Sequence, residues 1–158
     1  MKKYLKLVSA LMAVVAVIMM FFTQVTVEWI SGAKEVIGVS ALVGGKFPHL
    51  GTTINGVGSG LAGYILVGVA ALILLAVALI PYFNEHDILA AVVTGLAVIL
   101  LIIGVIFLFL IRKNFASANG IANGAKVYVG WAAITAGCLG SVSALLGSIG
   151  VVMDVANS

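Results

Sequence analysis

Hydrophobic residues in this chain are gathered into four long runs instead of alternating with polar ones. The runs cover residues 7–27, 61–83, 88–111 and 127–153, and none of them contains Asp, Glu, Lys, Arg or His. About 20 apolar residues in a helix cross the hydrocarbon core of a bilayer, where the backbone must satisfy its own hydrogen bonds. The pattern predicts an all-α membrane protein, with residues 1–158 forming one integral membrane domain built as a four-transmembrane-helix bundle.

The loops between the runs differ greatly in length. Only residues 84–87 join the second and third spans, which should therefore be antiparallel neighbours. The first loop, residues 28–60, is the one sizeable extramembrane segment. Its first half is apolar and β-branched, so it could form short strands or an interfacial helix, and periodicity does not separate the two.

Composition agrees with a membrane protein. Hydrophobic residues make up 63% of the chain and charged residues 8%, against about 45–50% and about 25% in soluble domains. The lipid bilayer is therefore the expected surroundings. A net charge of +3, spread along the chain, does not indicate a nucleic-acid partner.

The fourth span carries small residues at every fourth position, which places them on one helix face. This helix-packing stripe consists of Ala132, Ala136, Gly140, Ala144 and Ser148. Small residues let helix backbones approach closely in lipid. The stripe predicts either packing within the monomer or a seam with a second copy (a homo-oligomer) or another membrane protein, and both alternatives stay open.

The first span follows Lys2, Lys3 and Lys6, a basic flank typical of a signal sequence. No small-x-small cleavage site follows the apolar run, so we expect an uncleaved signal anchor. Because the first helix usually dominates orientation, we expect both termini in the cytoplasm and the protein in the plasma membrane. The five basic residues of the long loops oppose this orientation; they are Lys34, Lys46, Arg112, Lys113 and Lys126.

Candidate chemistry is sparse. Buried charge normally marks ion pathways and proton relays, and the four runs contain none. The two histidines, His49 and His86, fall in loops on opposite sides, and Cys138 is a lone mid-span thiol. We therefore predict no catalytic, metal or cofactor-binding residues, no cofactor, and no enzyme activity.

One exposed cluster stands out as a candidate partner loop. It consists of Lys46, Phe47, Pro48 and His49. The alternative is an ordinary loop anchored by Phe47.

The layout resembles that of the claudin-type tetraspan proteins. Both have four spans, a large first loop, a very short second loop and a modest third loop, and Trp29 lies just beyond the first span. The first-loop cysteine pair of that family is absent, because Cys138 is the only cysteine. The resemblance implies a tetraspan topology and transfers no functional residue.

These features predict a non-catalytic multi-pass membrane protein with a scaffolding, regulatory or assembly role. The alternative is a small oligomeric channel or transport subunit, whose polar lining would have to come from Ser, Thr, glycine backbone and the loops.

Overall fold

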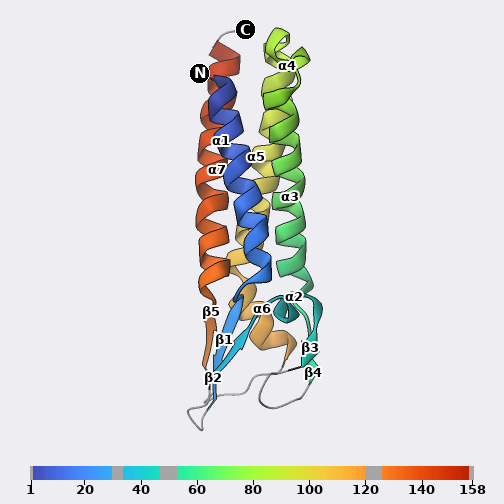
Figure 1. Ribbon diagram of the computed structural model, residues 1–158, viewed down its shortest axis with the longest axis vertical. Helices are drawn as coiled ribbons and strands as arrows, with labels where there is room; N and C mark the ends of the chain where they lie inside the picture. The colour runs from blue at the N-terminus through green and yellow to red at the C-terminus, as the bar shows by residue number, and fades with distance from the viewer. Residues whose placement is uncertain (1, 30–33, 47–52, 120–125, 157–158) are drawn as a thin grey trace.

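The computed structural model describes residues 2–29, 34–46, 53–119 and 126–156. Its main elements are four long helices: α1 (Lys2–Ile18), α3 (Gly58–Leu79), α5 (Asp87–Phe109) and α7 (Trp131–Ala156). They run side by side as one elongated bundle (Figure 1). All four are long and apolar enough to cross a membrane. The predicted all-α, four-helix membrane bundle is confirmed, and the chain has the architecture of a multi-pass membrane protein.

The helices form a ring in which each packs against two neighbours. α1 contacts α3 and α7, and α5 also contacts α3 and α7. Both chain termini and the short helix α4 (Tyr82–Glu85) lie at one end of the bundle, which we call the terminal end (Figure 1). The small extramembrane part lies at the opposite end.

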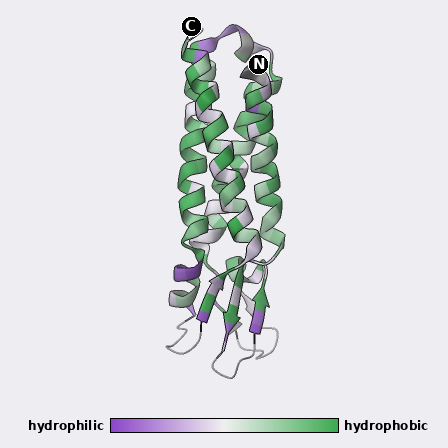
Figure 2. Ribbon diagram, turned by 90° about the vertical axis from the view of Figure 1, so that its left-hand side faces the viewer, coloured by the Kyte–Doolittle hydropathy of each residue, from purple (hydrophilic) through white to green (hydrophobic). Residues whose placement is uncertain are grey.

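The outside of the bundle is apolar along its length (Figure 2). Leu72, Leu96, Leu145 and Val152 are each more than half exposed. The buried positions of α1 and α7 are instead small, with Ala, Gly and Ser predominating. Large side chains facing outward and small ones facing inward are the arrangement expected of helices packed in lipid.

The extramembrane part, here called the head, combines both long loops. A three-stranded antiparallel sheet has the order β2 (Lys34–Ile37), β1 (Val25–Glu28), β5 (Lys126–Val129), so that the central strand pairs with one strand from each loop. The 3-10 helix η1 (Met19–Phe21) continues α1 to the end of the first span. The remaining elements of the head are α2 (Ser40–Val43), β3 (Gly45–Lys46), β4 (Thr53–Ile54) and α6 (Ile111–Ala118). β3 and β4 form a second, two-stranded sheet. The first loop thus forms short strands, with a four-residue helix between them.

Hydrogen bonds continue the sheet into the bundle. Gly130 N–H donates to the Gln24 carbonyl at 2.7 Å, and Ala132 N–H donates to the Thr23 carbonyl at 3.1 Å. A Cβ at Gly130 would lie 2.4 Å from the Thr23 carbonyl oxygen, so this crossing requires glycine. Backbone pairing therefore extends from the sheet to the start of α7 and to the segment that leads out of α1.

The helix ends differ from the predicted spans at the head. Residues 25–27 of the first predicted span lie in β1, and residues 127–129 of the fourth lie in β5. Both segments are apolar because they pack in a sheet, and hydropathy alone does not distinguish this from lipid contact. The second and third spans correspond to α3 and α5, with residues 81–83 turning away from α3.

Candidate functional site

A buried ion pair joins the first helix to the last at the terminal end of the bundle. Lys6 Nζ donates to Asp154 Oδ2 at 2.5 Å. The two side chains are 5% and 0% exposed. A lone charge at this depth would be costly, whereas two opposite charges in direct contact offset much of each other's desolvation.

A pair of serines forms a second polar contact between the same helices. Ser9 Oγ donates to the Ser143 carbonyl at 2.7 Å, and Ser143 Oγ donates to the Ser9 carbonyl at 2.7 Å. The two hydroxyl oxygens lie 2.9 Å apart, and both residues are fully buried. This reciprocal arrangement satisfies both hydroxyl protons inside the bundle.

Thr94 of α5 adds a polar group in the same half of the bundle. The Val98 side chain of α5 faces Gly147 of α7. Thr94 lies one helical turn closer to the terminal end than Val98. Thr94 is fully buried, and its Oγ1 has no hydrogen-bond partner within the described part of the chain. The terminal half of the bundle is thus polar at its centre.

The expectation of spans without charge is therefore wrong. The predicted runs stopped one residue short of both charges, at residues 7 and 153, but α1 and α7 extend past these points and bury Lys6 and Asp154. A sequence signal existed: Lys6, Ser9, Ala10, Ala13 and Ala16 follow the three- and four-residue spacing of a single helix face. All five are buried.

The small-residue stripe on α7 lies largely inside the bundle. Ala132, Ala136, Gly140 and Ala144 are buried, whereas Ser148 is exposed and donates to the Ala144 carbonyl at 2.8 Å. A Cβ at Gly140 would lie 2.6 Å from Val105 Cγ2 of α5. The neighbouring glycines behave alike, with Gly137 facing the ring of Phe109.

A different polar contact occupies the head end of the bundle. Tyr64 Oη of α3 donates to Gln24 Oε1 at 2.7 Å, and Gln24 Nε2 donates to the Met19 carbonyl at 2.7 Å. Both side chains are buried. Tyr64 therefore fastens α3 to the segment that leads from α1 into β1.

Side chains from the two long loops also bond to each other in the head. Asn55 N–H donates to Asn119 Oδ1 at 2.7 Å, and Asn119 Nδ2 donates to the Asn55 carbonyl at 3.0 Å. Asn114 Nδ2 of α6 donates to Ser59 Oγ of α3 at 2.9 Å. These bonds hold α6 against the start of α3.

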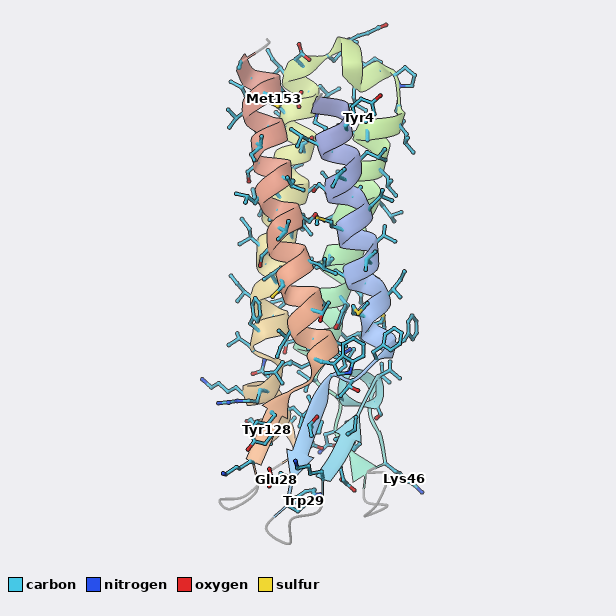
Figure 3. All side chains as sticks on the ribbon, turned by 60° about the vertical axis from the view of Figure 1, so that its left-hand side comes forward. Tyr4, Glu28, Trp29, Lys46, Tyr128 and Met153 are labelled. Carbon is cyan, nitrogen blue, oxygen red and sulfur yellow. The ribbon has the colours of Figure 1, made fainter. Side chains whose placement is uncertain are left out.

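Of the candidate partner loop, Lys46 is exposed in β3. Phe47, Pro48 and His49 lie outside the described residues. In the sheet, Glu28 pairs with Lys34 and Lys126, and two residues along the strand Thr26 pairs with Val36 and Tyr128. Figure 3 shows Glu28, Lys46 and Tyr128 at the head, far from Tyr4 and Met153.

Within the described residues, no group of three or more His, Cys, Asp or Glu side chains could hold a metal ion. The fold and its polar contacts define the class of protein as a multi-pass integral membrane protein with a small head. The chain matches no family model, no curated protein and no solved structure.

Proposed function

We propose that this multi-pass membrane protein is non-catalytic and acts in scaffolding, regulation or assembly, by holding its head in a fixed position for a partner protein. The observation that carries the proposal is the attachment of the head. Backbone pairing continues from β1 and β5 to Thr23 and to Ala132 at the start of α7, and a side-chain hydrogen bond fixes α6 to α3. A head attached to several helices keeps a constant orientation to the membrane, as a docking surface requires.

Packing at the centre of the bundle gives further support. A Cβ at Gly63 of α3 would lie 2.9 Å from the Gly104 carbonyl oxygen, and one at Gly147 would lie 2.8 Å from Val98 Cγ2. Helices in such close contact leave little room for a solute path between them. The partner is another membrane protein or a second copy of the chain.

Site-specific photocrosslinking in native membranes tests this function. A photoreactive amino acid at Val36 or Tyr128, both exposed in the head, should crosslink to the same partner protein from either position. That partner, once purified, should bind the wild-type protein. The same probe at Leu72, which is 68% exposed on the bundle, serves as the control and should react with lipid. Absence of any adduct from either head position would contradict the proposal.

The small channel or transport subunit remains the second candidate, and one observation favours it. Lys6, Ser9, Thr94, Ser143 and Asp154 provide buried polar groups in the terminal half of the bundle. Solute flux into liposomes containing only this protein, abolished by Asp154→Asn, would establish transport and displace the scaffolding role. The scaffolding role predicts flux no greater than in empty liposomes.

We further propose that α1 is retained as a signal anchor in the plasma membrane, with both termini cytoplasmic and the head outside. Retention of α1 is supported by its contacts, because its Lys6 and Ser9 bond to α7 inside the bundle. A Lys46→Cys variant in a Cys138→Ser background should react with a membrane-impermeant maleimide on intact cells. Reaction only after permeabilisation would reverse the orientation.

A further inference from the structure

α6 presents two basic side chains on a fixed helical surface beside the membrane. Arg112 and Lys113 are exposed, whereas Ile111 and Phe115 on the same helix are fully buried. The buried pair prevents α6 from rolling about its axis. The two cations therefore face away from the protein.

Hydrogen bonds fix both the middle and the end of this helix. Asn114 bonds to Ser59 of α3, and Asn119, directly after α6, exchanges hydrogen bonds with Asn55. A helix held in this way loses little conformational entropy when a ligand binds, so its contacts with the ligand give a higher affinity.

From their place directly after α5, Arg112 and Lys113 are expected at the depth of the lipid headgroups. They follow Phe109, the last residue of the membrane-crossing helix α5, by three and four positions. The headgroup layer on each side of the hydrocarbon core is roughly 5–7 Å thick. At the same end of the bundle, the Phe22 and Trp131 rings lie 5.5 Å apart, and tryptophan is typical of this layer.

No acidic side chain neutralises these two cations within the described part of the chain. The Lys6–Asp154 ion pair lies at the opposite end of the bundle. The two acids of the described head, Glu28 and Glu35, belong to the sheet, and Glu35 is fully buried. An anion is therefore the complementary ligand. Lys34 and Lys126 are also exposed, but they lie at the far end of the strands, roughly 10 Å beyond Val25.

We propose that Arg112 and Lys113 form a binding site for the phosphate of an anionic phospholipid in the leaflet on the head side. The planar guanidinium can donate two parallel hydrogen bonds to a phosphate, and the lysine adds a compact charge beside it. This site is separate from the proposed partner role and does not depend on it.

The test measures lipid retention by the full-length protein in detergent, using native mass spectrometry with equal amounts of phosphatidylglycerol and phosphatidylcholine. Each basic side chain near an anionic surface strengthens binding by a factor of about five. The R112Q/K113Q variant should therefore lose about tenfold or more of the preference for phosphatidylglycerol. R112K/K113R, which keeps both charges, should retain most of it.

K34Q/K126Q is the matched control because it also removes two exposed head charges. It should change the preference less than about twofold, since both lysines lie beyond the headgroup layer. Equal losses in the two Gln variants, or no loss in R112Q/K113Q, would overturn the site. Displacement of the lipid by millimolar inorganic phosphate, or by an acidic peptide, would also overturn it, in favour of a free-phosphate site or a protein-docking surface.

Should R112Q/K113Q fail to fold, the single variants Arg112→Gln and Lys113→Gln each carry the same test, at about half the effect on a logarithmic scale.

Discussion

The bundle contains two helix pairs that are held together in different ways. α1 and α7 meet through the Lys6–Asp154 ion pair and the Ser9–Ser143 hydrogen bonds. α3 and α5 meet through bare backbone, where a Cβ at Gly104 would lie 2.8 Å from the Gly63 carbonyl oxygen. The first pair is polar and specific, and the second relies on close apolar contact.

Chain connectivity explains the difference. α3 and α5 are joined by a short connection that contains α4, so they remain neighbours whatever their interface. α1 and α7 lie at opposite ends of the chain, and Lys6 and Asp154 are separated by 148 positions. In lipid, where apolar surfaces do not drive helices together, polar contacts give the distant pair its register.

Removal of one charge from the α1–α7 interface should have the largest effect. Lys6→Met leaves Asp154 buried without its ion-pair partner, which typically costs about 3–5 kcal/mol of unfolding free energy. Asp154→Leu should cost a similar amount. Both are measured by reversible unfolding in mixed micelles.

The double variant K6M/D154L provides the control for this experiment. It removes both charges together and should recover most of the lost stability. Single variants as stable as the wild type would show that the ion pair does not hold α1 to α7.

A smaller effect is expected at the α3–α5 interface. Gly104→Ala places a methyl group against the Gly63 carbonyl oxygen, which belongs to the backbone and cannot rotate away. Overpacking of this kind costs about 1–3 kcal/mol.

Gly95→Ala on the same helix is the matched control, because nothing lies within 4 Å of its added Cβ. Thermal unfolding in detergent should separate the two variants. Equal melting temperatures for them would refute the close backbone contact.

The smallest change is expected at the serine pair. Ser9→Ala removes the hydroxyl that donates to the Ser143 carbonyl, which keeps the hydrogen bond within its own helix. The free energy of unfolding should fall by about 0.6–1.7 kcal/mol, as for other hydrogen bonds between helices in membranes. Ser141→Ala is a suitable comparison, since the Ser141 hydroxyl donates to the Gly137 carbonyl of its own helix. A Ser9→Ala loss as large as that from Lys6→Met would contradict this ranking of the α1–α7 contacts.

Hydropathy predicted the four helices well because a long uncharged run must form a helix to cross a bilayer. The head was less predictable. Val25, Val27, Val127 and Val129 look like lipid-facing residues, but they pair across the sheet, and pairing between segments about 100 positions apart leaves no local pattern. Tyr64 likewise suits a membrane interface by its position in the sequence, yet it is buried against Gln24.

The ion pair was not predicted, for a related reason. Lys6 and Asp154 each look like a charge flanking a span, and only the packing of α1 on α7 brings them together inside the bundle. Spacing could have indicated that Lys6 shares a helix face with Ser9 and Ala13. The identity of its partner depends on the three-dimensional arrangement of the helices.

The direct contact between the first and last helices of one chain is the central feature of the bundle. A S9C/S143C variant in a Cys138→Ser background tests this contact by oxidation in the membrane, because the wild-type hydroxyl oxygens lie 2.9 Å apart. We expect rapid, nearly complete disulfide formation within the monomer, while S9C/S141C should remain largely reduced. Failure of S9C/S143C to crosslink, or crosslinking mainly between two chains, would contradict the α1–α7 contact.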